Sequence, residues 1–367
     1  MGGTAETGEA ATAARFIDAA GRGDSELLSE LLGREGSDPV HWVDSDTGRN
    51  ALFVAAENGH VTSVELLLGV LPWNSVDPLT GISAGDVAKN NGHETVFTAL
   101  VNAGIRTELL LNMMMEDAEP AEDERDGMEE QDDPSISPQA VVNADYLAQK
   151  LAFETAASGQ EQLVSSERDG VMMGWEKPLM EMHAAVICKN TDSNGERHVL
   201  NVGFGLGLVD GFIQSFKPDS HTIIEAHPDV YRHMEQTGWT SKPGVRVLFA
   251  RWQDVIEQFC DREYTGIFWD TFGEDYREMR NFHDLLPGIL RPSVGVYSFF
   301  NGLCATSQLF HQVALGVAEI DLKELGMTLQ FENVKIRDGV LKEETWAGIK
   351  RQYWSLENYS LPICKLP

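Results

Sequence analysis

Residues 199–212 read VLNVGFGLGLVDGF, an apolar run followed by three alternating glycines and a second apolar pattern with helical spacing. Glycines at these positions let the backbone turn tightly and approach a ligand, and the helix that follows offers free N–H groups at its N-terminus. The stretch therefore predicts a strand, a turn and a helix. The glycine turn alone leaves open a nicotinamide or flavin site, an S-adenosylmethionine site or a structural tight turn.

Around this stretch, short β-branched and aromatic runs alternate with helical patterns, which is typical of a parallel sheet covered on both faces. The predicted strands are residues 198–202, 221–225, 245–249, 266–269 and 295–299. The predicted helices are residues 208–216, 228–236, 253–260, 282–290 and 307–319. Two final strands, over 327–336 and 351–363, are expected to pair antiparallel at one edge. The predicted fold class is α/β, with a mostly parallel, seven-stranded, Rossmann-like sheet.

Two acids are predicted to lie at the carboxyl ends of strands. Glu225 follows Gly203 by 22 residues, at the end of the second strand, where a carboxylate can accept both hydroxyl hydrogens of a ribose. Because dinucleotide sites share this acid, it indicates a nucleoside without choosing its chemistry. The fourth strand ends in GIFWD and brings Asp270 to the same edge, where open α/β folds bind ligands.

A third acid precedes the first strand of the sheet. The segment DGVMMGWEKPLMEMHA, residues 169–184, carries Glu176 beside Trp175, with Met172 and Met180 as soft apolar neighbours. Methionines at helical spacing are also common in cores, so these two remain ambiguous. Two carboxylates and an aromatic wall suit a planar cation better than a hydride donor.

The N-terminal part of the chain contains an internal repeat. The triplet Asn-Gly-His occurs at 58–60 and at 91–93, which are 33 residues apart, and an apolar helical pattern follows each copy. The segments TGRNALFVAAENGHVTSVELLL and TGISAGDVAKNNGHETVFTALVNAG resemble ankyrin repeats. A helical stretch over about 11–32 is predicted to cap them. His60 and His93 are interpreted as turn-capping side chains, not as metal ligands.

An acidic segment separates the two parts. Between residues 116 and 133, eleven acids face a single arginine, and such a run repels itself and cannot form a core. We therefore predict a repeat module over 1–110, a disordered linker over 111–140 and the α/β domain over 141–367. The formal net charge of −30 argues against direct binding to nucleic acid or to a membrane and favours a basic partner.

Other features bound the location and the chemistry. No apolar run approaches the ~20 residues of a membrane span, and the start has no secretory pattern. The four cysteines are scattered without a C-x-x-C pair, so neither a disulfide framework nor a metal site is expected. This pattern predicts a reducing compartment, the cytoplasm and nucleus.

Five ordered motifs carry a resemblance to a known family. They are VMMGWEKPLM, VLNVGFGLGLVDGF, TIIEAHPDVYRHM, ARWQDV and GIFWDTFGEDYREMRNFHDLLPGILRPSVGVYSFFNGL. Together they resemble guanidinoacetate methyltransferase over roughly 145–365. With the ankyrin-like part, over 45–105, the chain is similar to the fungal type IV protein arginine methyltransferases, which modify the internal (δ) guanidino nitrogen. The two-glutamate loop of the better-known arginine methyltransferases is not found, so terminal-nitrogen dimethylation is not expected.

The resemblance implies S-adenosylmethionine as cofactor and assigns roles to matching positions. It aligns Glu176 and Asp270 with the acids that grip the guanidinium, and we interpret Asp270 as principal base and Glu176 as the partner that orients and neutralises. Phe153 is placed as a lid over the cofactor. The residues implied to contact the cofactor are Phe153, Met172, Met180, Gly203, Phe204, Gly205, Leu206, Gly207, Leu208, Glu225, Ala226, His227, Ala250, Arg251, Trp252 and Asp270.

The resemblance further implies a ribosomal protein as the acceptor. A small guanidino metabolite such as guanidinoacetate is the alternative, and the oligomeric state stays open. A binding module that has lost catalysis is disfavoured by the intact acids and glycines, and an NAD-dependent oxidoreductase is weaker still. His183, His283 and His311 are interpreted as helix-surface or satisfied core residues.

Overall fold

The computed structural model describes residues 5–35, 41, 43–44, 47–117, 144–156, 159–336 and 341–367. The chain divides into two compact units. The repeat unit comprises residues 1–125 and 303–318, and the sheet unit comprises residues 126–302 and 319–367. Helix α6 (Glu94–Asp117) enters the segment predicted as a linker. The rest of that prediction, from residue 118 to 140, lies outside the described residues.

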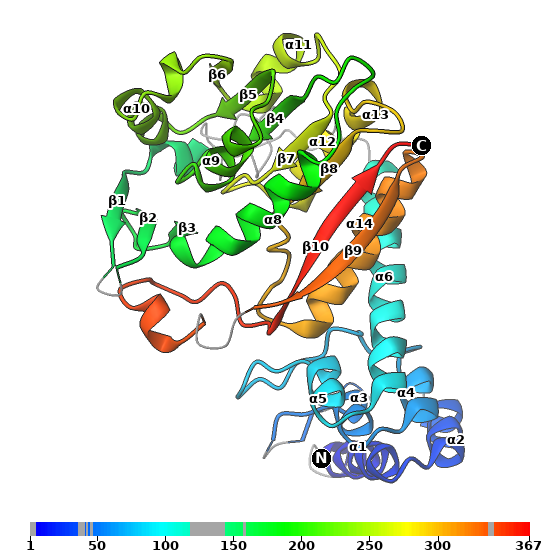
Figure 1. Ribbon diagram of the computed structural model, residues 1–367. Coiled ribbons are helices and arrows are strands. Elements are labelled where there is room, and N and C mark those ends of the chain that lie inside the picture. The colour runs from blue at the N-terminus through cyan, green and yellow to red at the C-terminus, as the bar shows by residue number, and fades with distance from the viewer. Residues whose placement is uncertain are drawn as a thin grey trace, which may run out of the picture. The chain divides into compact units, whose positions relative to one another are not determined.

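The sheet unit is built on seven strands in the order β6-β5-β4-β7-β8-β10-β9 (Figure 1). Strands β6, β5, β4, β7 and β8 run parallel, and β10 pairs antiparallel with both β8 and β9. This arrangement confirms the predicted fold class and the antiparallel edge. The strands are β4 (His198–Val202), β5 (Ser220–Glu225), β6 (Val245–Phe249), β7 (Gly266–Trp269), β8 (Val296–Phe299), β9 (Thr328–Lys335) and β10 (Asn358–Lys365).

Helices alternate with these strands, largely as predicted. They are α8 (Lys177–Ile187), α9 (Leu208–Ser215), α10 (Pro228–Gln236), α11 (Ile256–Phe259), α12 (Tyr276–His283), α13 (Leu286–Ile289) and α14 (Gln308–Glu324). A 3₁₀ turn, Trp252–Val255, precedes α11. The single helix predicted over 282–290 is wrong. Pro287 lacks an N–H and would clash with the carbonyl of His283, so α12 ends there and α13 starts separately.

A small antiparallel sheet precedes α8 and was not predicted. It consists of β1 (Leu151–Thr155), β2 (Glu161–Ser165) and β3 (Gly170–Met173), paired in that order. Arg168 takes a left-handed φ of 67° in the turn between β2 and β3. Strand β3 leads directly into a 3₁₀ turn, Gly174–Glu176, and this turn fixes where the Glu176 side chain starts.

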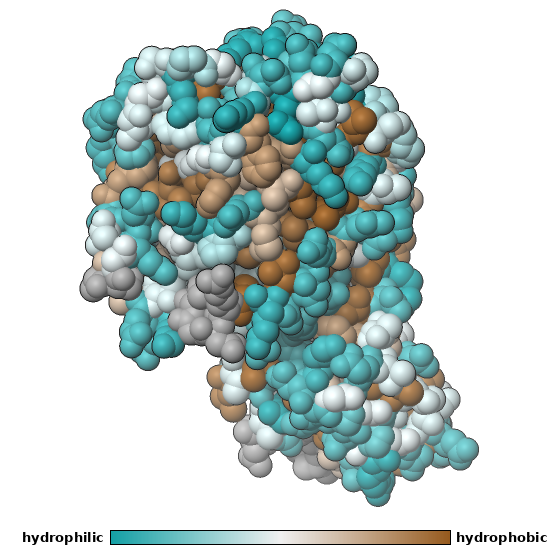
Figure 2. Space-filling model, viewed as in Figure 1, coloured by the Kyte–Doolittle hydropathy of each residue, from teal (hydrophilic) through white to brown (hydrophobic). Residues whose placement is uncertain are grey.

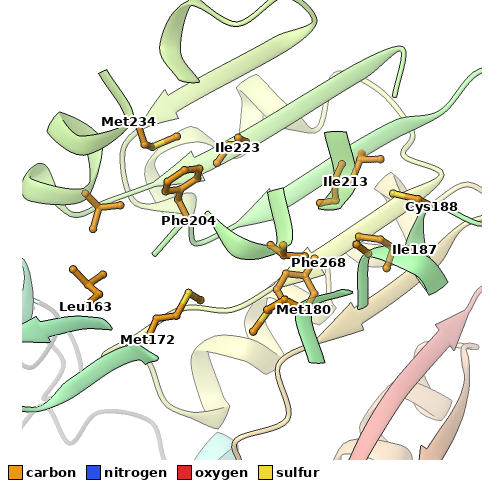
Figure 3. Packing of buried hydrophobic residues seen from close by; sticks show 14 of the residues in the cluster. Leu163, Met172, Met180, Ile187, Cys188, Phe204, Ile213, Ile223, Met234 and Phe268 are labelled. Carbon is orange, nitrogen blue, oxygen red and sulfur yellow. The ribbon is translucent and has the colours of Figure 1, made fainter. Parts of the chain in front are cut away.

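The core of the sheet unit lies between β4, β5, β7 and the helices that cover them. Phe204, Phe268 and Met180 are at most 1% exposed, and Met172 lies at the edge of the same cluster (Figure 3). Burying side chains of this size contributes about 1.5–3 kcal/mol each. Met180 is therefore a core residue, which resolves one half of the ambiguity left by the methionine pair.

The repeat unit is helical. Its helices are α1 (Ala5–Arg22), α2 (Ser25–Glu35), α3 (Ala51–Glu57), α4 (Val61–Leu67), α5 (Ala84–Asn90) and α6, joined by the first part of α14. The short helices α3 and α5 begin at the capping side chains of Asn50 and Ser83.

The ring of His60 bonds the carbonyl of Gly21, and that of His93 bonds the carbonyl of Glu57. Each ring thus connects its own turn to an earlier helix of the repeat unit. The side chain of His60 does not cap α4, which it precedes.

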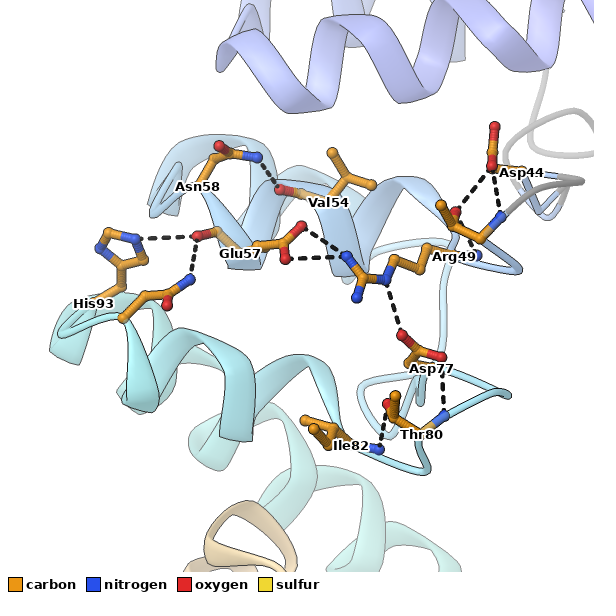
Figure 4. A network of polar contacts seen from close by, with 11 residues as sticks. Asp44, Arg49, Val54, Glu57, Asn58, Asp77, Thr80, Ile82 and His93 are labelled. Atoms are coloured by element: carbon orange, nitrogen blue, oxygen red, sulfur yellow. Dashed lines mark hydrogen bonds and ion pairs between the residues drawn. The ribbon is translucent and has the colours of Figure 1, made fainter.

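One arginine links neighbouring turns of the repeat unit. Arg49 donates to both carboxylate oxygens of Glu57, at 3.0 and 3.1 Å, and to Asp77 at 2.9 Å (Figure 4). The Asp77 carboxylate also accepts from the amides of Leu79 and Thr80, which close its own turn.

Among the described helices, none combines the length and the apolarity that a bilayer crossing requires.

Candidate active site

The glycine turn after β4 packs directly on the end of β7. Gly203 has a φ of +93°, and a Cβ added there would lie 1.9 Å from the carbonyl oxygen of Asp270. The amide of Asp270 donates to Val202 at 2.9 Å, which continues the parallel ladder to the last residue before the turn. The structure thus confirms that Asp270 and the glycine turn meet at one edge of the sheet, and it gives the reason for glycine at 203.

Met172 lies against the same turn. A Cβ added at Gly205 would be 2.9 Å from the Met172 sulfur, and the amide of Leu206 points at that sulfur from 3.3 Å. Phe204 turns inward beneath Gly207, where an added Cβ would meet its ring at 2.4 Å. The turn therefore presents backbone on one side and rests on apolar side chains on the other. Leu208 begins α9 directly after it.

Glu225, at the end of β5, is tied to this turn. Its side chain is 7% exposed, and it accepts hydrogen bonds from the amides of Phe204 at 2.9 Å and of His227 at 2.6 Å. Burial raises the pKa of Glu225, and the amide hydrogen bonds, including one from Ala226, oppose that rise. The carboxylate therefore holds the ends of β4 and β5 together beside the position where a nucleoside is expected.

Glu176 and Asp270 form a buried acidic pair. Glu176 is 2% exposed and accepts from the amide of Met173 at 3.0 Å and from the hydroxyl of Tyr353. Burial raises the pKa of Glu176 to about 7. Burial, followed by the charges of Glu176 and Asp210, raises the pKa of Asp270 well above its usual range. Within the described part of the chain, the buried Oδ2 of Asp270 has no hydrogen-bond partner.

This pairing has a chemical meaning. Buried carboxylates with raised pKa values, beside which the described residues place no cation, are candidates for binding or catalysis. A planar cation placed there would lower both pKa values and would give Oδ2 of Asp270 a donor. The sequence prediction that these two acids come together is consistent with this geometry.

An aromatic wall stands beside Glu176. Trp175 is 3% exposed, and its ring centroid lies 5.9 Å from Trp354 and 6.1 Å from both Trp346 and Tyr353. In the space-filling view, apolar side chains in tan and brown form a band across the sheet unit near α8 and α9, with hydrophilic ones around it (Figure 2). Sequence analysis identified Trp175 but missed Tyr353, which lies in the C-terminal segment, residues 341–357, before β10.

A second tyrosine was also missed. The ring of Tyr146 lies 5.1 Å from His227 and 4.9 Å from Phe272, and burial and the charges of Glu225 and Asp270 raise its pKa. Phe153, expected as a lid, stacks at 3.9 Å on His233 of α10. Tyr146 is thus an aromatic side chain close enough to Glu225 and Asp270 to be affected by their charges. An isolated tyrosine next to a charged linker gave no sequence signal.

Residues 250–252 follow β6 and border the same edge. The amide of Ala250 donates to the carbonyl of Glu225 at 3.1 Å. Trp252 is 5% exposed, packs edge-on against Trp269 at 5.6 Å and donates from Nε1 to Glu274. The tryptophan is therefore a core residue, while the backbone beside it stays near Glu225. Arg251 directs its guanidinium towards Gln253, at 3.4 Å.

His183, His283 and His311 are all buried, which agrees with their interpretation as core residues. His183 is fully buried between the hydroxyls of Ser298 and Tyr359, at 2.8 and 2.7 Å, and burial lowers its pKa to about 3. Burial has the same effect on His283, which bonds the hydroxyl of Tyr297. The ring of His311 bonds the carbonyl of Leu303 at 2.6 Å.

Comparisons with known proteins agree with this division of the chain. A family model for guanidinoacetate N-methyltransferase matches residues 151–286, and one for three copies of the ankyrin repeat matches residues 16–110. The ankyrin match begins inside the stretch predicted as a cap. A solved spermidine synthase from Thermotoga maritima is 13% identical, with a TM-score of 0.38 over 58% of this chain and 71% of that one, a likeness too low to carry an argument.

Two fungal relatives are much closer. Protein arginine N-methyltransferase 2 from Yarrowia lipolytica is 41% identical over 225 residues, which cover 60% of this chain and 46% of that protein. Protein arginine N-methyltransferase 2 from Cryptococcus neoformans is 34% identical over 377 residues, which cover 96% of this chain and 94% of that protein. With nearly the full length of the Cryptococcus relative matched, the chain belongs to the protein arginine N-methyltransferase 2 family.

Proposed function

We propose that this chain monomethylates the internal (δ) guanidino nitrogen of arginine in a basic protein, with S-adenosylmethionine as the methyl donor. Family membership makes it an S-adenosylmethionine-dependent arginine methyltransferase. The observation that carries the finer proposal is the buried pair Glu176 and Asp270, which lies beside the glycine turn and in which Oδ2 of Asp270 has no hydrogen-bond partner among the described residues.

The residues at the sheet edge fit the cofactor. The three glycines of the turn have no side chains to block a ligand, and α9 begins at its end, where free N–H groups favour a polar group. Glu225 and the backbone near Ala250 would hold the nucleoside, and Tyr146 would cover it. When bound, S-adenosylmethionine supplies an electrophilic methyl group. Met172 and the turn would set the depth of the site.

The two acids would prepare the acceptor. An arginine side chain has a pKa above ~12, so the nitrogen to be methylated must give up its proton. Carboxylates form fork-shaped, charge-assisted hydrogen bonds that fix the guanidinium plane. Glu176 orients and neutralises the group, and Oδ2 of Asp270 accepts the proton. Burial suits this role, because a raised pKa makes Asp270 a stronger base near neutral pH.

The same grip supports the choice of nitrogen. A guanidinium whose terminal N–H donates to Glu176 while its internal N–H faces Oδ2 of Asp270 is fixed in orientation, and the internal nitrogen, once it has given up its proton, is the one that remains for methylation. Holding the reacting groups in one geometry can supply up to ~7–11 kcal/mol of the barrier reduction. The way in which Glu176 and Asp270 hold the guanidinium, not the sequence around the arginine, would thus decide which nitrogen receives the methyl group.

The identity of the acceptor is a separate proposal. A ribosomal protein is the acceptor that the resemblance implies, and a basic protein complements a chain of net charge −30. A small guanidino metabolite is the second candidate, because the guanidinoacetate N-methyltransferase model covers residues 151–286. The repeat unit and the acidic run would have no evident role in binding a small metabolite.

The test of the reaction is the position of the methyl group. Purified protein is incubated with isotopically labelled S-adenosylmethionine and a basic ribosomal protein extract, and the products are fragmented by mass spectrometry. We expect label on arginine, one methyl group per residue, with fragments that place it on the internal nitrogen. Label only on terminal nitrogens would contradict the δ assignment. Label only on added guanidinoacetate would favour the metabolite candidate.

The acidic run gives a second test, which separates the two acceptors. Replacing the eleven acids between 116 and 133 by their amides should lower kcat/KM for the basic protein by about 10-fold or more at low salt, because steering by charge is lost. Activity on a small guanidino compound should stay unchanged. Deleting residues 1–138 is a poorer test, since Phe310 packs against Trp73 at 5.3 Å and would be uncovered.

A further inference from the structure

The hydroxyl of Tyr353 has a defined direction of donation. It lies 3.2 Å from the Nε1 of Trp175 and bonds Oε1 of Glu176. An indole N–H can only donate, so the tyrosine oxygen accepts there and its own hydrogen points to the carboxylate. A donor in this position favours the charged form of Glu176.

We propose that Tyr353 is a positioning residue, which holds the Glu176 carboxylate so that one oxygen stays available to grip the acceptor arginine. In the described part of the chain, both hydrogen bonds to this carboxylate, from the Met173 amide and from Tyr353, end on Oε1. Oε2 therefore keeps its lone pairs for an incoming N–H. The inference rests on the proposed function, which assigns Glu176 to the acceptor.

The segment that carries Tyr353 is fastened to the turn between β2 and β3. The amide of Lys350 donates to the carbonyl of Arg168 at 2.7 Å, and the Arg168 side chain donates to the carbonyl of Gly348 at 2.7 Å. Gly170 leaves space for the tyrosine ring, since a Cβ there would lie 3.1 Å from it. The small sheet thus positions both Glu176 and Tyr353. It holds Glu176 through β3 and Tyr353 through the turn between β2 and β3.

The groups that interact with Glu176 come from three elements. Tyr353 lies before β10 and bonds the carboxylate, and the charge of Glu176 in turn raises the pKa of Tyr353, of Asp270 at the end of β7 and of Tyr359 in β10. Burial raises the pKa of Glu176, and the hydrogen bonds from Tyr353 and Met173 lower it. Removing the Tyr353 hydroxyl should therefore raise this pKa further, so that more of Glu176 is neutral at pH 7.

The test is Tyr353→Phe, which keeps the ring against Trp175. A hydrogen bond to a charged group of ordinary strength predicts a rise of about 10–100-fold in KM for the protein acceptor at pH 7. The acid limb of kcat/KM should move up by about 1–2 pH units, and activity should recover at pH 9. Affinity for S-adenosylmethionine, measured by calorimetry, should not change.

A readout without turnover follows the carboxylate itself. Carbon-13 NMR of labelled glutamate side chains should show the Glu176 signal, identified by its loss in Glu176→Gln, titrating about 1–2 pH units higher in Tyr353→Phe. The control Tyr297→Phe removes another buried hydroxyl, which bonds His283, and should leave this midpoint unchanged.

Two results would overturn the inference. One is an unchanged Glu176 midpoint in Tyr353→Phe. The other is an equal loss of activity at every pH together with a lower melting temperature, which would indicate a structural role. If the wild-type protein does not methylate arginine, the proposed function fails, and the NMR midpoints still decide whether Tyr353 controls Glu176.

Discussion

Asp270→Asn should lower kcat by about 10²–10⁴-fold while S-adenosylmethionine still binds. The amide has the shape of the carboxyl group, but it can neither accept the proton from arginine nor balance the guanidinium charge. Since burial already raises the pKa of Asp270, loss of the charge should not destabilise the folded protein. Turnover is measured on the basic protein acceptor, cofactor affinity by calorimetry and stability by thermal melting.

The control for this variant is Asp261→Asn, which removes the same charge from a surface site. Asp261 is 45% exposed and pairs with Arg262 at 3.3 Å, away from the acidic pair. Its activity should match that of the wild type. An Asp270→Asn protein that turns over at the wild-type rate would eliminate Asp270 as the base.

Gly203→Ala should abolish cofactor binding and destabilise the sheet unit. A φ of +93° strains any side chain, and the added Cβ would sit 1.9 Å from a backbone oxygen that cannot rotate away. Backbone strain and overpacking together predict a loss of about 2–6 kcal/mol in the free energy of unfolding. Urea denaturation measures this loss, and calorimetry with S-adenosylmethionine measures the binding.

Gly211→Ala is the matched control. Gly211 lies inside α9, and a Cβ there would meet nothing within 4 Å. The same substitution should stabilise the protein by about 0.5–1 kcal/mol, because alanine favours helix. Opposite signs for two alanines eight residues apart would attribute the effect to the turn. Equal, small effects would show that the contact between Gly203 and Asp270 does not constrain the site.

The sheet could be predicted best where a strand is apolar throughout. Strand β7 is buried on both faces and leaves an unbroken apolar run in the sequence. Strands β4 and β6 also have the predicted bounds, although β6 is largely exposed or half-buried. The predicted helix over 282–290 was wrong because the apolar residues keep a helical spacing on both sides of Pro287. That spacing does not reveal the break that a residue without an N–H causes. Strands β1 and β2 mix exposed and buried residues, so their sequences show neither an unbroken apolar run nor a regular alternation of apolar and polar residues.

The candidate site was predicted in part. Glu225 and Asp270 could be found because strand ends are readable in sequence and meet at one edge. Tyr353 could not, because 177 residues separate it from Glu176 and the segment around it is mostly irregular. Such a contact depends on the β2–β3 turn that fastens the segment, and a single sequence carries no sign of that pairing.

The aromatic wall gives the protein an intrinsic fluorescence signal close to Glu176. Trp175 precedes Glu176, the side chain that would receive a cation, and two more of the eight tryptophans, Trp346 and Trp354, have ring centroids within 6.1 Å of that of Trp175. Indole emission responds to nearby charge and to the polarity around the ring, so a guanidinium that enters beside Glu176 would change the intrinsic fluorescence. Binding of the acceptor arginine beside Glu176 could then be followed in real time without a dye.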